Sequence, residues 1–204
     1  MCLDVDLSSN GSFGMGRDSK FGDFEELCRD IKPNIIDLQE TKLHCVNNKR
    51  VCTLCGSNEC DYLQKEMVGK FGGQLIIWDT NFFHVSDSFI CDFFIDVRGT
   101  WKISGNMFTI INVYGSHNDS DKKKMWHALS SDLRRGGGNA FMLCGDFNEV
   151  LEQDEMLYCE FIESRAKRLN DFISSNYLMN LLIGGHKFTH DSDDGIKYIE
   201  LDGF

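Results

Sequence analysis

Phe141-Met-Leu-Cys-Gly-Asp-Phe-Asn-Glu-Val150 is the stretch around which the rest of the chain is organised. Four apolar residues run into Gly145, and a short apolar run closed by glycine predicts a buried strand that ends at a surface. Residues two apart in an extended chain point to the same side, so Asp146 and Asn148 are expected together at the mouth of a sheet, with Phe147 in the packing. Taken alone, a Gly-Asp pair is more often an ordinary polar turn.

The size and charge of the chain limit its class. Its 204 residues, of which 42% are hydrophobic and 26% charged, predict a single globular domain over residues 1–204 with a sizeable core. A net charge of −11 argues against nucleic-acid binding through a broad basic surface, but not against an enzyme that meets nucleic acid through a metal-neutralised site. Nine cysteines and an amino terminus without signal-peptide features favour an intracellular, reducing compartment, and no apolar run is long enough to cross a membrane.

Strands and helices are interleaved along the chain. Strands are expected over residues 2–7, 34–38, 74–78, 89–97, 107–114 and in the opening stretch, whereas residues 43–72 show no clear pattern. Helices are expected before Pro33, from near Asp119 to the glycines at 136–138, and in the segment after residue 160. Several consecutive strands in the middle of the chain predict a layered α/β fold whose sheets are not purely parallel.

Apolar side chains at helical spacing define the inward face of each expected helix. In the first helix, which Asp18 or Ser19 can cap, this face holds Phe21, Phe24, Leu27, Cys28 and Ile31. In the later helices it holds Met125, Trp126, Leu129, Leu133, Leu169, Phe172 and Ile173.

Polar side chains follow several of the expected strands. Asn10 follows the first strand, Glu40 the second, Tyr114 ends the strand over 107–114, and Asp146 and Asn148 end the opening stretch. If these ends gather at one edge, the site holds carboxylates, amides and a phenol, which are hard oxygen donors that suit Mg²⁺ or Mn²⁺. Phosphate-ester hydrolysis needs charge neutralisation and an activated water, so Glu40 is a candidate metal ligand and Asp146 a candidate proton-transfer group.

At these positions the sequence resembles a known superfamily. Leu38-Gln39-Glu40-Thr41-Lys42, Asn112-Val113-Tyr114 and Gly145-Asp146-Phe147-Asn148 resemble motifs of the endonuclease/exonuclease/phosphatase superfamily. Gly72-Gly73-Gln-Leu-Ile-Ile-Trp78-Asp79, Gly184-Gly185-His-Lys-Phe188-Thr189 and Ser192-Asp193-Asp194-Gly195 are similar to the endonuclease domain of plant LINE-type retrotransposons. The resemblance implies a DNase I-like layered α/β sandwich, in which two mixed β-sheets pack face to face with helices outside.

The resemblance also implies roles for individual residues. Glu40 resembles the metal-binding glutamate, and Asn10 the asparagine near the metal and the phosphate. Tyr114 resembles the tyrosine that contacts the scissile phosphate, Asp146 the aspartate that acts on the water or the leaving oxygen, and Asn148 the amide that orients the phosphate.

The amino- and carboxy-terminal motifs depart from the family pattern. The family motif Asn-x-Arg-Gly is replaced by Asn10-Gly-Ser-Phe-Gly, which lacks the arginine. Asp202 resembles the aspartate that orients the catalytic histidine, but Glu200 stands where the family has arginine, and the sequence ends at Phe204 before the closing strand with its Asp-His pair. The expectation is a carboxy-terminally truncated, weak or inactive copy with its last strand missing.

The function implied is a Mg²⁺-dependent DNA endonuclease that nicks target DNA to prime reverse transcription. Its expected partners are DNA and the reverse transcriptase domain of the parent polyprotein, with no membrane partner, a monomeric state, and the nucleus as its compartment if it is active. The alternatives are a phosphomonoesterase of the same superfamily, which the charge of −11 favours, and a non-catalytic remnant.

Three further groups of residues have a plain and a functional interpretation. Cys45, Cys52, Cys55 and Cys60 fit a variable loop better than a zinc site. Lys122-Lys123-Lys124 fits the solvated face of a helix better than a phosphate contact, and His117 fits a loop residue better than a substrate contact.

Overall fold

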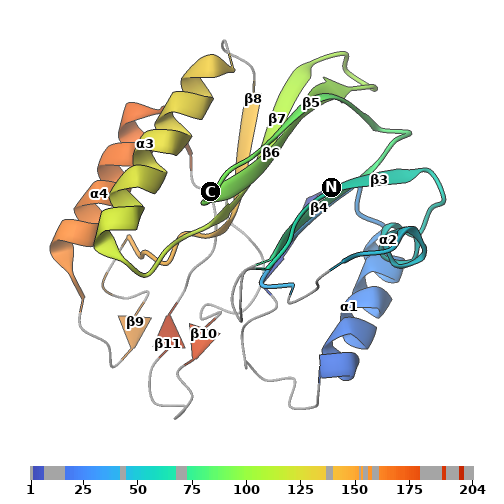
Figure 1. The fold of residues 1–204 in the computed structure, drawn as a ribbon, viewed down its shortest axis with the longest axis horizontal. Helices are drawn as coiled ribbons and strands as arrows, with labels where there is room; N and C mark the ends of the chain where they lie inside the picture. The colour runs from blue at the N-terminus through green and yellow to red at the C-terminus, as the bar shows by residue number, and fades with distance from the viewer. Residues whose placement is uncertain are drawn as a thin grey trace.

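Two four-stranded sheets pack face to face, with helices on both outer sides (Figure 1). This computed structural model describes residues 2–6, 17–41, 45–67, 73–136, 140–151, 153, 156–157, 161–179, 190–191 and 198–199. The predicted layered α/β sandwich with two mixed sheets is confirmed.

The first sheet has the strand order β1-β2-β4-β3, and the second has the order β5-β6-β7-β8. The strands of the first sheet are β1 (Cys2–Asp6), β2 (Ile35–Gln39), β3 (Cys60–Lys65) and β4 (Gln74–Asp79). Those of the second are β5 (Phe83–Ile90), β6 (Phe94–Trp101), β7 (Met107–Tyr114) and β8 (Ala140–Asp146). Only β1–β2 and β7–β8 are parallel pairs within these two sheets. A small antiparallel sheet holds β9 (Met156–Leu157), β10 (His190–Asp191) and β11 (Tyr198–Ile199).

The alternation of side chains along β2 and β4 builds the core on both faces of the first sheet. Ile36 and Leu38 point outward and pack beneath α1 (Arg17–Ile31) and α2 (Asn48–Cys55). Ile35 of β2 and Ile76 of β4 point inward and pack against residues of β5, β6 and β7. Because both faces are covered, these strands are almost continuously apolar, as expected for strands buried on two sides.

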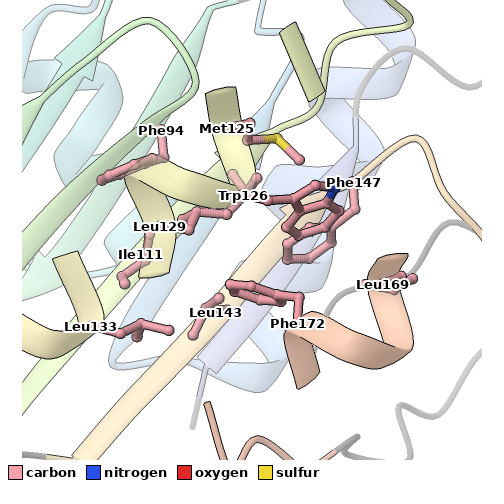
Figure 2. Close-up of a cluster of buried hydrophobic side chains, with 11 residues drawn as sticks. Phe94, Ile111, Met125, Trp126, Leu129, Leu133, Leu143, Phe147, Leu169 and Phe172 are labelled. Carbon is pink, nitrogen blue, oxygen red and sulfur yellow. The ribbon is translucent and has the colours of Figure 1, made fainter. Parts of the chain in front are cut away.

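The outer face of the second sheet is covered by α3 (Asp119–Arg135) and α4 (Glu163–Ser175) (Figure 1). Trp126 lies at the centre of this layer: its ring stacks on Phe147 with centroids 5.7 Å apart and meets Phe172 at 4.7 Å (Figure 2). Phe147 is 1% exposed, so its predicted place in the packing is confirmed. The inward faces predicted for these two helices are also confirmed, as Met125, Trp126, Leu129, Leu133, Leu169 and Phe172 are buried. Ile173, predicted on the same face, is partly buried against this cluster.

Two expectations about local structure were wrong. The single strand expected over 89–97 is in fact two strands, because β5 ends at Ile90 and β6 begins at Phe94, with the Cys91 N–H bonded to the Phe94 carbonyl at 3.0 Å. Aromatic residues on both sides of this tight turn concealed it. Leu27 was expected to point inward but is 41% exposed. The apolar side chains of α1 span a wider face of the helix than the face that packs on the sheet.

The stretch without a clear pattern contains α2 and β3. Asn47 caps α2, its side-chain oxygen accepting from the Arg50 N–H at 2.9 Å, and Gly56 ends the helix with φ of 67°. An asparagine before a helix and a glycine after it are the usual boundary residues, so this pair was the signal available in the sequence. In the described part of the chain, no helix is long and apolar enough to cross a membrane.

Candidate active site

The ends of β2, β7 and β8 meet at one edge of the two sheets. Tyr114, the last residue of β7, is paired with Asp146, the last residue of β8, in a parallel register. Glu40 directly follows β2 in the other sheet, and the Tyr114 hydroxyl donates a hydrogen bond to its Oε1 atom. The fold therefore brings together three of the predicted site residues, from segments that are distant in the sequence.

Glu40 has an unusual backbone conformation, with φ of 48°. Left-handed backbone at a residue other than glycine costs on the order of 1 kcal/mol, and such residues are over-represented at functional sites. Asn148, another predicted site residue, has φ of 52°. The predicted metal ligand Glu40 and the predicted phosphate-orienting residue Asn148 thus follow their strand ends in the same uncommon backbone conformation.

A buried polar network joins the two sheets directly behind this edge. The Asn112 amide donates to Asp37 Oδ1 and to the Leu38 carbonyl at 3.0 Å. Gln74 Nε2 donates to the Asn112 side-chain oxygen at 2.9 Å and to its backbone carbonyl at 2.8 Å. Asp37, Gln74 and Asn112 are each at most 1% exposed, so these bonds form in a low-dielectric interior where they are strong.

Sequence reasoning missed Asp37 and Gln74. The signal was present, because a carboxylate within the apolar run Ile35-Ile36-Asp37-Leu38 must find a partner if the strand is buried. The network fixes the end of β2 relative to the end of β7. It thereby sets the separation of Glu40 and Tyr114, which follow the bonded residues by only a few positions.

Two glycines allow β7 and β8 to approach closely at this edge. Gly145 has φ of 113°, and a Cβ atom there would lie 2.1 Å from the Val113 carbonyl oxygen. A Cβ atom on Gly115 would lie 2.3 Å from the Phe147 carbonyl oxygen. The Gly115 N–H donates to the Asp146 carbonyl at 2.6 Å, so the turn after β8 is bonded to the end of β7.

The relationship between Asp146 and Asn148 differs from the expected one. Because Asn148 is left-handed, the alternation of an extended chain does not extend to it. Instead, the Asn148 N–H donates to Asp146 Oδ1 at 2.6 Å, and its side-chain amide donates to the Gly115 carbonyl at 2.6 Å. The two residues do lie together, but a tight turn rather than a shared strand face joins them.

Lys122 is buried, so its expected place on a solvated helix face was wrong. It is 1% exposed, and its Nζ atom donates to the Asn148 carbonyl and pairs with Glu149 Oε1 at 3.0 Å. Its neighbours Lys123 and Lys124 are exposed, as expected. Helical spacing was the missed signal, because position 122 lies three and four residues before the inward Met125 and Trp126.

The remaining candidates are two residues outside the described part of the chain, His117 and the cysteines. Asn10 and Asp202 lie outside the described residues. His117 is exposed between β7 and α3. The Sγ atoms of Cys52 and Cys60 lie 3.8 Å apart, but nowhere in the described residues do three or more His, Cys, Asp or Glu side chains form a group that could hold a metal ion.

Solved structures with the same fold include both nucleases and phosphatases. The AP endonuclease of Leishmania major matches with a TM-score of 0.58 at 12% identity, covering 78% of this chain and 62% of that one. The catalytic domain of human Nocturnin with bound sulfate matches with a TM-score of 0.57 at 13% identity (73% and 64% covered). A mannosyl-6-phosphatase of Bacteroides thetaiotaomicron matches with a TM-score of 0.51 at 17% identity (74% and 67% covered).

These similarities establish the fold of the endonuclease/exonuclease/phosphatase proteins. No protein-family model matches the sequence, and no curated protein matches it significantly. The chain spans less than two thirds of the length of the Nocturnin and AP endonuclease chains that it matches, with coverage of 64% and 62%.

Proposed function

We propose that this chain is a divalent-metal-dependent phosphodiesterase that nicks DNA, as the endonuclease domain of a LINE-type retrotransposon. The observation that carries the proposal is the hydrogen bond between Tyr114 and Glu40, which brings a phenol and a carboxylate from opposite sheets to one edge. Asp146 and Asn148 lie at the same edge through the pairing of β7 with β8. The AP endonuclease from Leishmania major, whose name states a nuclease activity, has the same fold.

The donors at this edge suit a hard divalent cation. Glu40 and Asp146 supply carboxylate oxygens, and Mg²⁺ uses only one or two protein carboxylates, with water and substrate phosphate in its other positions. Glu40 is 7% exposed and its backbone is held in a strained conformation, as expected for a preorganised ligand. Glu40 would hold Mg²⁺ or Mn²⁺, which would neutralise phosphate charge and lower the pKa of a bound water.

The remaining residues have roles that follow from their donors and acceptors. Asp146 accepts a hydrogen bond from the Asn148 N–H, and in the proposed reaction its carboxylate would exchange a proton with the attacking water or the leaving oxygen. The Tyr114 hydroxyl and the Asn148 side-chain amide are neutral donors that can bind phosphate oxygens. In the present structure these donors are directed to Glu40 and to the Gly115 carbonyl, so substrate would have to replace those acceptors.

A plasmid-nicking assay with Mg²⁺ tests the proposal. Conversion of supercoiled plasmid to the open circle should require the metal and should fall about 10²- to 10⁴-fold in Glu40→Gln and in Asp146→Asn, since each removes a carboxylate without changing shape. Glu59→Gln, at an exposed position between α2 and β3, is the matched control and should nick at the wild-type rate. Nicking that is equal in all four proteins would refute the assignment.

A phosphomonoesterase is the second candidate. The net charge of −11 disfavours a long polyanion relative to a small phosphate ester, and the mannosyl-6-phosphatase has the same fold. Hydrolysis of mannose 6-phosphate that depends on Glu40, without plasmid nicking, would support this candidate.

Absence of both activities in a protein that melts cooperatively would favour a non-catalytic domain. Reverse-transcriptase sequence on the same polypeptide would support the retrotransposon assignment.

A further inference from the structure

Lys122 is a buried charge placed directly behind the turn that presents Asp146 and Asn148. We propose that it is a positioning residue for the hydrolytic site: its ammonium group holds the Asn148 backbone carbonyl, and thereby fixes the turn, from the helix layer. The inference rests on the proposed function for its catalytic consequence. Its structural part, an ordered turn that depends on Lys122, can be tested without any activity.

Three hydrogen bonds hold Asn148 in its left-handed conformation. Its N–H donates to Asp146 Oδ1 at 2.6 Å, its side-chain amide donates to the Gly115 carbonyl at 2.6 Å, and its carbonyl accepts from Lys122 Nζ. The first two partners belong to the strand ends themselves. Lys122 belongs to the first turns of α3, so its bond connects the edge of the sheet to the helix that packs on it.

An ammonium group is not needed at this position for packing. The side chains that follow on the same face of α3 are apolar, including Met125, Trp126 and Leu129, and an apolar residue of similar volume would continue that face. Replacement of both partners of a buried ion pair by well-packed apolar side chains is often neutral or stabilising, whereas replacement of Lys122 alone would also leave the buried Glu149 without its lysine partner. The bond to the Asn148 carbonyl and the pairing with Glu149 are therefore the two properties of Lys122 that an apolar residue could not supply.

Glu149 is the counter-charge of the buried ammonium group. Burial lowers the pKa of Lys122, and the hydrogen bond and charge of Glu149 oppose that shift. The two side chains are 1% and 2% exposed, and their Nζ and Oε1 atoms lie 3.0 Å apart. Arg168 of α4 lies 3.6 Å from the same Glu149 oxygen, so the carboxylate is shared between both covering helices. Lys122, Glu149 and Arg168 thus form one charged cluster, which contacts Asn148 directly and Asp146 through the Asn148 N–H.

Hydrogen exchange of single backbone amides, followed by NMR, measures the order of the turn. In Lys122→Met the Asn148 amide is expected to exchange at least about tenfold faster, because the opening free energy of a local unit falls with its contacts. The amides of Ile110 and Ile111 in β7 should keep their wild-type rates. Lys123→Met is the matched control: it removes the neighbouring lysine from the exposed side of α3 and should leave all three amides unchanged.

Steady-state nicking separates positioning from stability. Lys122→Met is expected to lower kcat about 10- to 100-fold with KM within about twofold, because a displacement near 1 Å at a catalytic group has an effect of that size. Lys122→Arg, which keeps a positive charge and a donor, should recover part of the loss. A lower melting temperature with wild-type kcat and wild-type Asn148 exchange would show that Lys122 is only structural.

The hydrogen-exchange and nicking experiments together distinguish failure of this inference from failure of the proposed function. If the wild-type chain neither nicks plasmid nor hydrolyses a phosphate ester, the proposed function fails, while the exchange experiment still decides whether Lys122 orders the turn. If Lys122→Met does not fold, the wild-type chain provides the test. An Asn148 amide that exchanges as fast as the amide of Ile103, in an exposed turn, would overturn the inference.

Discussion

The Tyr114 hydroxyl donates a hydrogen bond to Glu40 Oε1, and these residues are 74 positions apart in the chain. Tyr114 ends a strand of one sheet and Glu40 follows a strand of the other, so the hydrogen bond joins the two sheets at this edge. It forms just in front of the buried Asn112, whose amide already joins the same two strands. The candidate site therefore lies next to the buried hydrogen bonds of Asn112 that join the two sheets.

Tyr114→Phe should lower both activity and stability. Loss of a hydrogen bond to a carboxylate destabilises by about 1.5–3 kcal/mol, and loss of the phenol also removes a phosphate donor, for which we expect about a 10-fold or larger drop in kcat. Urea denaturation and plasmid nicking measure the two effects. Tyr62→Phe is the control, since it removes a 3.3 Å bond to the Val46 carbonyl at a distance from the site. Equal loss of activity in both variants would contradict the assigned role.

Asn112→Ala should be among the most destabilising single substitutions in the chain. Asn112 is fully buried and donates to Asp37 and to the Leu38 carbonyl, so alanine removes donors from a buried carboxylate. Losing one partner of such a buried charged contact costs about 3 kcal/mol or more, measurable by urea denaturation. Asn106→Ala, at an exposed turn, should stay within about 0.5 kcal/mol of wild type. A small effect at Asn112 would mean that the network contributes little to stability.

Gly145→Ala should disrupt the edge itself. Its Cβ atom would lie 2.1 Å from the Val113 carbonyl oxygen, and φ of 113° is strained for any other residue. We expect a loss of more than about 3 kcal/mol, or failure to fold, because a backbone atom cannot move aside cheaply. Gly22→Ala is the opposite control: it lies in α1 with nothing within 4 Å, and should stabilise by about 0.5–1 kcal/mol. Thermal melts compare the two variants directly.

Local patterns in the sequence predicted most of the elements but not the contacts between them. The inward face of α3 followed from the spacing of Met125, Trp126 and Leu129 alone. The same spacing includes Lys122, yet its charge and its two lysine neighbours pointed to solvent, and only the tertiary contact with Glu149 reveals why it is inside. A local pattern cannot show that a distant chain segment supplies a counter-charge.

In the candidate site, too, the sequence predicted local features but not tertiary contacts. Glu40, Tyr114, Asp146 and Asn148 were found as polar residues at strand ends, which is a local property. The left-handed conformations of Glu40 and Asn148, and the bonds among these residues, depend on how β7 pairs with β8 and on how the sheets face each other, which is not local. Asp37 was hidden for a related reason, because a carboxylate within a strand is satisfied by Asn112 from the opposite sheet.

Stability should fall as pH rises through the titration range of Asp96. Burial, with a further contribution from Asp132, raises the pKa of Asp96 from 3.8 to about 6, while Arg98 acts to lower it. Because the folded pKa lies above the ordinary value, the folded state holds this proton more tightly than the unfolded state. The contribution of protonated Asp96 to the free energy of unfolding is present in full below about pH 4 and is lost as pH rises through about 6. Its size is on the order of 1–3 kcal/mol.

Asp96→Asn isolates this contribution, because asparagine stays neutral and can still accept from Arg98, whose Nε atom lies 3.1 Å from the Asp96 carboxylate. The free energy of unfolding of the variant, relative to wild type, should therefore rise between pH 4 and pH 8. Urea denaturation at several pH values measures it, and Asp87→Asn, on the exposed part of β5, serves as the control. A difference between Asp96→Asn and wild type that does not change with pH would show that Asp96 has the same pKa in the folded and unfolded protein, and that Arg98 offsets its burial.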